Sequence, residues 1–461
     1  MKFYGRKHEL EVLELLGSNK PSLVIITGMR RIGKTELIKR FCRDREFAYF
    51  FVDKNKTTSM LMEEFQEELK GIVPIPEYVT FRKPEDLLEF ILKMDRDNLI
   101  VFDEFQRFQR SDPSFISTFQ KMWDLHGNDS RSTIIISGSS MGMIRRIFIE
   151  SESPLFKRAD NIMTLRPFTI GECFGIMEDL GVKDPDDRLD IYLLFGGVIY
   201  YYRLMEKYNV GSFDDALNKL VLNDLAPLRN EIMDILIEEF GSEHITYHEI
   251  LSAMAMGKAS KKEIGDMTHI ESTSLSPYIY DLRDILGIVE SAVPVTEDPG
   301  RSKKTRYFLK NNYFRFHYRF LYRNMSDYQI GNFQRIKDLI EKGWSTHRGR
   351  LFENLALDHV RRTMSHIYPR IGRYWDRMGN ELDIVGMNED HDIKMVLEVK
   401  ARKMDLDEAK RLISSLEKKV GKIFGDKIKP EIGVVAIEVE GKDSIANSGH
   451  PCFDLEDMIS N

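Results

Sequence analysis

The sequence predicts an α/β fold, because short apolar strands alternate with helical segments across the first third of the chain. Strands are expected at 23–27, 48–52, 99–103, 133–138 and 162–165. Helical patterns lie between them, as at 37–42 and 59–70. Runs such as SLVIIT and NLIVFD are apolar almost throughout, which is typical of the centre of a parallel sheet covered on both faces.

The rest of the chain divides into three further segments, so that four domains are expected in 461 residues. Residues 1–165 form the first domain, and residues 166–230 are mostly helical. Residues 231–330 give helix, helix, turn, helix and a two-stranded ribbon, which is the order of a winged helix. Residues 331–461 give a connecting helical stretch, a helix at 350–364, three strands, a helix and a strand, which indicates a second α/β domain.

Composition indicates a globular protein of a reducing compartment. Hydrophobic residues make up 42% and charged residues 31%, and the net charge of -7 excludes a broadly basic surface. The three cysteines show no CxxC pairing, which favours the cytoplasm over a disulfide-forming compartment. The charged start and the short apolar run at 191–202 predict neither export nor a membrane segment.

A phosphate-binding motif follows the first strand, where GMRRIGKT matches G-x-x-x-x-G-K-[ST] in full. Glycines let backbone N–H groups surround a phosphate, the lysine reaches the β- and γ-oxygens, and the last hydroxyl ligates Mg²⁺. A glycine turn without a ligand is the alternative, and the strand-to-helix context argues against it. A nucleoside triphosphate is expected at Gly28, Met29, Arg30, Arg31, Ile32, Gly33, Lys34 and Thr35.

Two carboxylates end the third strand, LIVFDEFQ, at the edge where open α/β sheets bind ligands. Asp103 is expected to hold the hydrated Mg²⁺, and Glu104 to polarise the attacking water as general base. The alternative is that both acids only solvate a strand end.

Two further candidates lie downstream. The fourth strand, TIIISGSS, ends in hydroxyls, among which Ser139 is expected to sense the γ-phosphate or orient water. Serines also commonly just end strands. Arg158 in SPLFKRAD is a candidate arginine finger, with an ordinary surface arginine as the alternative.

Six segments together resemble the archaeal-type ATPase family, a branch of the AAA-related STAND NTPases. They are FYGRKHELEVL, GMRRIGKTEL, LIVFDEFQ, IIISGSS, SPLFKRADNIMTLRPF and LLFGGVIYYY. The resemblance covers roughly the first half of the chain. It implies a RecA/AAA-like core, a helical lid over 166–230 and ATP as the nucleotide.

The expected winged helix carries its positive charge on the wing. Asp281 and Asp284 lie on the would-be recognition helix, which argues against base readout. Four cations suited to phosphate contacts lie within the wing: Arg301, Lys303, Lys304 and Arg306. A winged helix that contacts protein or acts as a spacer is the alternative.

The last domain carries acids where a metal site needs them. Glu398 and Lys400 in VLEVKA are two apart on a strand, so their side chains emerge on the same face. Asp383 in GNELDIVG is expected to share Mg²⁺ with Glu398, while Lys400 stabilises transition-state charge. Glu353 on the preceding helix is a further catalytic candidate. An edge of alternating charges is the alternative, but it does not explain acids after the apolar MVL.

These residues resemble the D...ExK signature of the restriction-endonuclease-like superfamily, PD-(D/E)xK. The domain also resembles the C-terminal domain of unknown function that follows archaeal-type ATPases. The resemblance covers roughly the last quarter of the chain. It implies a nuclease-like fold, with DNA as the partner of this domain and of the winged helix.

Three hypotheses for function stay open at this point. The first is a cytoplasmic ATPase whose nucleotide state controls the nuclease-like domain. The second is a STAND-type signalling switch whose C-terminal domain only binds, and the third is a DNA-binding regulator without catalysis. A second copy of the chain is a further candidate partner.

Overall fold

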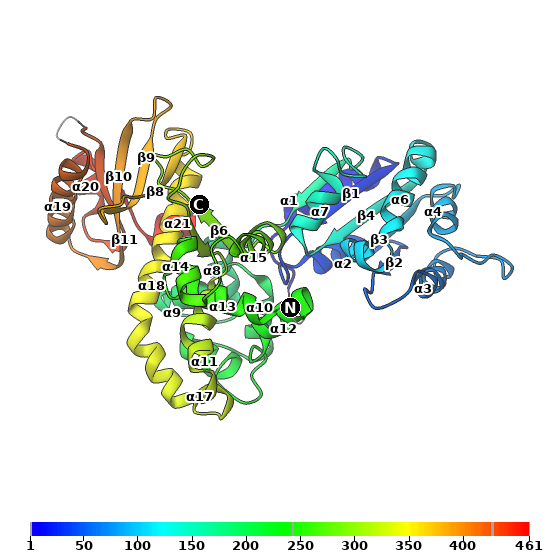
Figure 1. The fold of residues 1–461 in the computed structure, drawn as a ribbon, viewed down its shortest axis with the longest axis horizontal. Coiled ribbons are helices and arrows are strands. Elements are labelled where there is room, and N and C mark those ends of the chain that lie inside the picture. Colours follow the sequence, from blue (N-terminus) through cyan, green and yellow to red (C-terminus); the bar gives the residue numbers. More distant parts are fainter. Residues whose placement is uncertain (1, 242–243, 426–427, 461) are drawn as a thin grey trace. The chain divides into compact units, whose positions relative to one another are not determined.

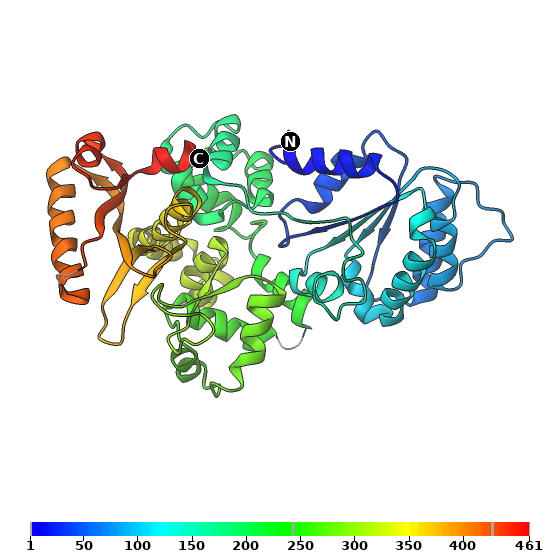
Figure 2. The ribbon, with the colours of Figure 1, turned by 90° about the horizontal axis from the view of Figure 1, so that it is seen from above.

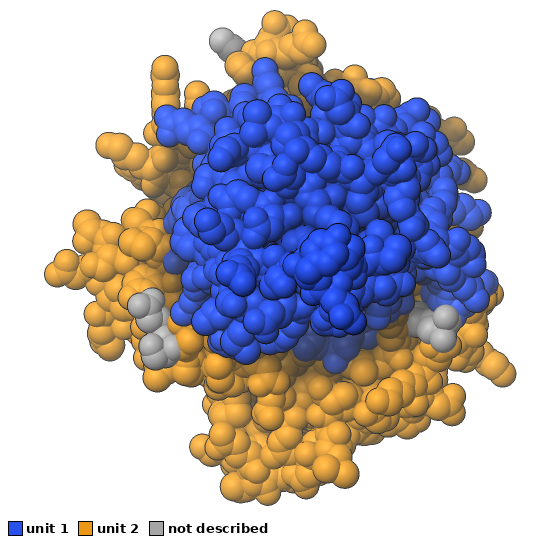
Figure 3. Space-filling view, turned by 90° about the vertical axis from the view of Figure 1, so that its right-hand side faces the viewer, with its two compact units in different colours: residues 1–167, 198–200, 280–287 blue, residues 168–197, 201–279, 288–461 orange. Residues whose placement is uncertain are grey.

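The structure, a computed structural model, describes residues 2–241, 244–425 and 428–460. The chain forms two compact units, which Figure 3 colours separately. Unit 1 comprises residues 1–167, 198–200 and 280–287. Unit 2 comprises residues 168–197, 201–279 and 288–461. The division into four domains stays a prediction.

A five-stranded parallel sheet forms the centre of unit 1 (Figure 1). Its strands are β1 (Ser22–Thr27), β2 (Ala48–Phe51), β3 (Asn98–Asp103), β4 (Ser132–Gly138) and β5 (Asn161–Thr164). They follow the order β2-β3-β4-β1-β5, and every pairing is parallel. The predicted parallel α/β sheet is confirmed. Because β4 lies between β1 and β3, the ends of these three strands share one edge.

Helices cover both faces of this sheet (Figure 2). Alternate strand residues point to opposite faces, so Ile25 joins one buried cluster while Val24 and Ile26 join the other. The Val24 side packs against α1 (Lys7–Ser18) and α2 (Lys34–Cys42). The opposite side packs against α3 (Thr58–Lys70), α4 (Pro84–Leu92), α5 (Phe108–Ser111), α6 (Pro113–His126) and α7 (Met141–Phe148).

Unit 2 begins with helices that continue through most of its first half. They are α8 (Ile170–Asp179), α9 (Pro185–Phe195), α10 (Ile199–Lys207), α11 (Phe213–Leu220), α12 (Glu231–Phe240), α13 (His244–Ala255), α14 (Lys261–Thr268) and α15 (Leu275–Tyr280). Residues 199–200 and Tyr280 belong to unit 1, as does the π-helical turn η4 (Asp281–Ile285). The antiparallel ribbon β6 (Val289–Ala292) and β7 (Arg306–Leu309) follows. Helices and a ribbon therefore follow each other over 231–330, while the winged helix stays a prediction.

A short helical segment connects the ribbon to the last sheet. It consists of α16 (Asn312–Phe316), η5 (His317–Leu321), η6 (Tyr322–Asn324) and α17 (Met325–Gln329). The long helix α18 (Phe333–Met364) then runs without a break, so it joins the expected helix at 350–364 to the helical stretch before it. Buried residues recur along its whole length, from Ile336 to Val360, which explains the single helix.

A mixed five-stranded sheet closes unit 2, with the order β12-β11-β10-β9-β8. Its elements are β8 (Arg370–Trp375), β9 (Glu381–Met387), β10 (Ile393–Met404), α19 (Leu406–Phe424), β11 (Glu431–Val439), α20 (Lys442–Asn447), β12 (Cys452–Phe453) and α21 (Leu455–Ser460). β10 is antiparallel to β9 and parallel to β11. The separate C-terminal α/β sheet is confirmed, whereas β12 and the two last short helices were not expected from the sequence.

No helix in residues 2–241, 244–425 and 428–460 combines the length and the apolar character that crossing a membrane requires.

Two glycines of α8 distinguish its packed face from its open face. A Cβ at Gly171 would lie 2.1 Å from the carbonyl oxygen of Ile459 in α21, whereas a Cβ at Gly175 would meet nothing within 4 Å. We expect Gly171→Ala to destabilise the protein by about 1–3 kcal/mol through overpacking. Gly175→Ala should stabilise it by about 0.5–1 kcal/mol, since alanine favours a helix interior. Urea unfolding of the full chain measures both; equal effects of the two changes would contradict the packing of α8 on α21.

Candidate functional site

The loop between β1 and α2 contains the phosphate-binding motif, and its two glycines have different structural reasons. Gly33 has a φ of 98°, a backbone conformation that favours glycine, and it immediately precedes α2. Gly28 packs closely against the backbone that follows β5, because a Cβ at this position would lie 2.8 Å from the carbonyl oxygen of Leu165. Both positions therefore exclude a side chain, as a loop that wraps its backbone around a ligand requires.

The side chain of Lys34 lies against this loop. It is buried, and its ammonium group donates to the carbonyl oxygens of Gly28 at 2.8 Å and Met29 at 3.2 Å. Ile32 is fully buried in the core, whereas the guanidinium of Arg31 lies 4.0 Å from the ring centroid of Tyr200. The loop is thus anchored by one apolar residue, and its lysine is retained inside it.

Three hydroxyl groups contact the carboxylate of Asp103 at the end of β3. Thr35 Oγ1 lies 3.4 Å from Asp103 Oδ2, and Ser137 Oγ donates to Oδ1 at 2.7 Å. The phenol of Tyr49 also donates to Oδ2. Burial and the charge of Asp103 raise the pKa of Tyr49, so this phenol stays protonated as a donor. The structure thus brings Thr35 and Asp103 together and adds Tyr49, which the sequence analysis missed.

Glu104 occupies a left-handed backbone conformation with a φ of 57°, directly after β3. Its Oε2 accepts from Ser139 Oγ at 2.8 Å and from Gln106 Nε2 at 2.5 Å. Arg107 lies 3.7 Å from the same oxygen. Ser139 therefore contacts Glu104 directly, and the buried Gln106 is a second residue that sequence reasoning missed.

The four residues predicted for a metal site in the C-terminal domain lie on three elements. Glu353 is on α18, Asp383 is on β9, and Glu398 and Lys400 are on β10. Leu397 pairs with Ile384 across antiparallel β9 and β10, which puts Glu398 opposite Asp383. Lys400 Nζ lies 2.8 Å from Glu398 Oε1, and Asp383 Oδ2 accepts from the backbone N–H of Val399 at 2.9 Å.

Electrostatics link these residues to Glu353 on α18. Burial first, and then the charge of Glu398, raise the pKa of Asp383. Burial and the charge of Asp383 likewise raise the pKa of Glu353. Three carboxyl groups therefore share a partly buried region with Lys400. Among the described residues, no three His, Cys, Asp or Glu side chains are arranged closely enough to chelate one ion.

Comparisons with known proteins agree with this geometry. Residues 3–205 match the model of a family described as an ATPase domain predominantly from Archaea. Residues 317–412 match a family described as archaeal and bacterial proteins of unknown function. The first match spans the loop at Lys34 and the two acids at the end of β3. Residues 3–205 have the fold of a P-loop ATPase core and are similar to this ATPase family.

Relatives extend the comparison beyond the ATPase domain. An uncharacterised protein of Methanocaldococcus jannaschii is 28% identical over 463 residues, covering 99% of this chain and 100% of that protein. A second protein of that organism, called an ATP-binding protein, is 49% identical over 45 residues, or 10% of this chain and 76% of its own length. A Walker-type ATPase of Pyrococcus abyssi has a similar fold, with a TM-score of 0.51 and 19% identity, covering 69% of this chain and 96% of its own.

Arg158, the candidate arginine finger of the ATPase domain, has local partners. Its guanidinium forms two hydrogen bonds with Asp124, at 2.7 and 2.8 Å, and donates to the carbonyl oxygen of Pro154 at 2.9 Å. The hydrogen bonds to Asp124 also raise the pKa of Arg158. These contacts favour the alternative of an ordinary surface arginine, because a finger would have to release Asp124 first.

The four cations of the ribbon turn fall into two pairs. Lys304 forms an ion pair with Glu297, and Arg306 forms one with Glu381 at 2.7 Å. Arg301 and Lys303 are exposed. The ribbon and its turn therefore present two of these four cations to solvent.

Two serines near Asp103 test how its carboxylate is held. Ser137→Ala removes a buried hydrogen bond to a charged group, so we expect it to destabilise the protein by about 1.5–3 kcal/mol. Ser140 is the matched control, because its hydroxyl is buried and has no hydrogen-bond partner among the described residues. We expect Ser140→Ala to change the free energy of unfolding by less than about 0.5 kcal/mol. Urea denaturation measures both, and a larger loss for Ser140→Ala would contradict the assignment.

Proposed function

We propose that the ATPase domain binds ATP with Mg²⁺ at the loop between β1 and α2 and hydrolyses it. The observation that carries this proposal is the contact between Thr35 and Asp103, 68 positions apart in sequence and 3.4 Å apart in space. A hydroxyl and a carboxylate are oxygen ligands of the kind that Mg²⁺ prefers. The relative called an ATP-binding protein supports ATP as the nucleotide.

The donor set fits a magnesium nucleotide. Thr35 would bind the ion directly, while Asp103 would hold it through coordinated water. When bound, the ion neutralises charge on the β- and γ-phosphates. Lys34 would exchange the carbonyl oxygens of Gly28 and Met29 for phosphate oxygens, which are stronger acceptors for an ammonium group.

Glu104 is the proposed general base. Its position directly after Asp103 places it at the ligand-binding edge of the sheet, and Ser139 and Gln106 orient its carboxylate. A carboxylate held in this way accepts the proton of the attacking water. Ser139 thus acts through Glu104, which refines its expected role as a sensor of the γ-phosphate.

Glu104→Gln should lower ATP hydrolysis by about 10²–10⁴-fold, because a positioned base contributes about that much. ATP should still bind, since the amide keeps the size of the side chain. Lys34→Ala should lose ATP binding itself. Phosphate release and calorimetric titration measure the two steps, with Glu77→Gln as a control at an exposed loop carboxyl. Wild-type turnover in Glu104→Gln would reject this base.

A metal-dependent nuclease-like site is the second proposed function, located in the C-terminal domain. It is supported by the group of Glu353, Asp383, Glu398 and Lys400, in which burial and mutual repulsion raise the pKa of two acids. A divalent cation would relieve this repulsion and activate water for attack on a phosphodiester. DNA is the proposed substrate, with Arg301 and Lys303 as additional phosphate contacts.

The nucleotide state of the ATPase domain would then control this second site. If DNA stays intact at saturating protein with Mg²⁺ or Mn²⁺, the C-terminal domain only binds, as in a STAND-type switch. If ATP turnover is absent as well, the protein is a regulator without catalysis.

Asp383→Asn tests the carboxylate group without relying on cleavage. The raised pKa of Asp383 gives stability that is fully present below its ordinary value of 3.8 and is lost as pH rises through the folded-state value. In metal-free buffer the variant should therefore be more stable than wild type at pH 7, and this gain should vanish near pH 3. Urea unfolding at both pH values measures the gain.

Mn²⁺ supplies the second part of this test. It should raise the melting temperature of the wild type but not of Asp383→Asn, because ligand binding stabilises only the folded state that binds it. Asp390→Asn, an exposed change in the same hairpin, is the control. Equal stabilisation of all three proteins by Mn²⁺ would reject a metal site at Asp383.

A further inference from the structure

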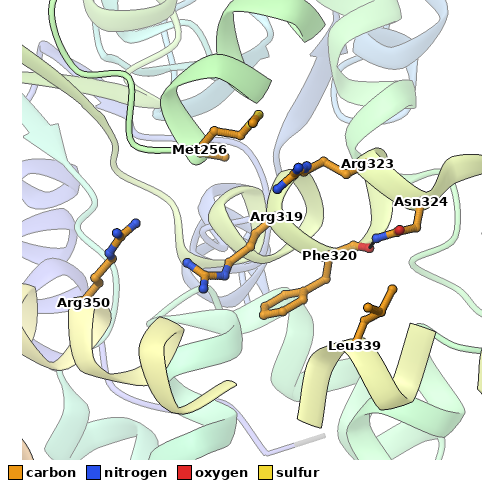
Figure 4. A pocket seen from close by; sticks show the side chains of 8 residues that line it. Met256, Arg319, Phe320, Arg323, Asn324, Leu339 and Arg350 are labelled. Carbon is orange, nitrogen blue, oxygen red and sulfur yellow. Dashed lines mark hydrogen bonds between the residues drawn. The ribbon is translucent and has the colours of Figure 1, made fainter. Parts of the chain in front are cut away.

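A cavity of about 490 Å³ lies within unit 2, and one of its arginines, Arg350, stands three positions before Glu353 on α18 (Figure 4). Its walls come from the C-terminal end of α13, from η5 and η6, and from α18. The residues that matter for its chemistry are Met256, Arg319, Phe320, Arg323, Leu339 and Arg350. The cavity thus combines apolar side chains with three arginines, and the described residues of its lining include no acid.

The three guanidinium groups lack a close carboxylate among the described residues, although the charge of Arg350 acts on Glu353 and partly offsets the raised pKa of that carboxyl. Figure 4 shows Arg319, Arg323 and Arg350 arranged around one opening. In the part of the chain that the structure describes, none of them forms an ion pair with a carboxylate. Arg348 on the same helix differs, because it pairs with Asp186 at 2.8 Å and Asp190 at 2.7 Å. The arginines that face the cavity therefore differ from Arg348, whose charge is neutralised within the protein.

The positive charge of these arginines contributes to lowered pKa values of Arg319 and of the nearby His347. Burial, then the charges of Arg350 and Arg323, lower the pKa of Arg319. Burial, and then the charges of Arg319, Arg315 and Arg350, lower the pKa of His347 to about 3. His347 packs against Phe320, with ring centroids 5.3 Å apart. Arginine stays charged at any ordinary pH, so this region keeps an excess of positive charge that a bound anion would neutralise.

We propose that this cavity binds a small ligand with two or more phosphate groups, chemically a nucleoside polyphosphate. Arginine forks match phosphate oxygens in two-point hydrogen bonds, and three of them suit more than one phosphate. Phe320, Leu339 and Met256 offer apolar contact to a base. A volume of about 490 Å³ is within the range of small-molecule sites.

A single concave site of this size favours a small ligand over duplex DNA, which tracks along an extended basic surface. All residues of the site belong to unit 2, whereas residues 28–35 belong to unit 1. The proposal is therefore independent of ATP binding at the loop of the ATPase domain.

The test uses the full chain with Lys34→Ala, which removes binding at that loop. Calorimetric titration with ADP should show one site per chain, and inorganic tripolyphosphate should compete for it. Adding Arg319→Gln and Arg350→Gln together should weaken ADP binding roughly tenfold or more, because each removes charged hydrogen bonds to phosphate. Arg411→Gln is the matched control, an exposed arginine of α19 outside the cavity, and it should leave the affinity unchanged.

Stability without ligand separates binding from a structural role. Because the arginines repel each other, the double variant should unfold at the same urea concentration as its parent or a higher one. If it fails to fold, the exposed Arg323→Gln replaces it and should weaken ADP by several-fold. Three results would overturn the proposal: no heat with ADP, ADP affinity unchanged by the arginine variants, or loss of duplex DNA binding in these variants without any binding of ADP or tripolyphosphate.

Discussion

The contact between the Thr35 hydroxyl and the Asp103 carboxylate depends on the order of strands in unit 1. Thr35 follows β1, Asp103 ends β3, and β4 lies between these two strands. The sheet must therefore be parallel and in register for the two side chains to meet. β4 then contributes Ser137 to one oxygen of Asp103, and β2 contributes Tyr49 to the other. An ionised carboxylate at a buried strand end is costly unless it is hydrogen-bonded, and these hydroxyl groups meet that need. The same carboxylate stays within reach of the loop at Lys34, so the fold of the sheet and the chemistry of the site have one physical basis.

The residues that the sequence predicted well are those whose spacing is set by local structure. Lys34 and Thr35 follow from the turn between a strand and a helix, and Asp103 follows from an apolar strand that ends in an acid. Tyr49 was missed because its role depends on β2 lying beside β3, which no local pattern reveals. The pattern that could have indicated Tyr49 is its place on β2, two residues before Phe51, which pairs with Asp103 and so puts both side chains on the same face of the sheet. Arg158 appeared available in the sequence because its partner Asp124 lies 34 positions earlier on α6. The boundary of α18 was missed for another reason, since its buried face changes partners along the helix while the helix itself continues.

Unit 2 contains two concentrations of charge of opposite sign. Asp383, Glu353 and Glu398 form one group, in which Lys400 and Lys419 both lie close to Glu398. Arg319, Arg323 and Arg350 form the other group, around a cavity. The sequence pattern indicated the first group, because D and ExK are placed by strand alternation. It did not indicate the second, because these arginines come from η5, η6 and α18 and meet only when the segments pack. Charges of one sign held together raise the free energy of the protein until a ligand of the opposite sign binds. We propose a cation and a phosphate ligand as the respective partners.

The most direct test of the central claim is a crystal structure of the protein grown with Mn²⁺ and a non-hydrolysable ATP analogue, in which anomalous scattering locates the metal. We expect a manganese peak at direct bonding distance from Thr35 Oγ1, linked to Asp103 through a coordinated water, with Lys34 turned from the loop carbonyls to the phosphates. A peak at another position, with the Thr35 to Asp103 contact unchanged and the loop empty, would contradict this account.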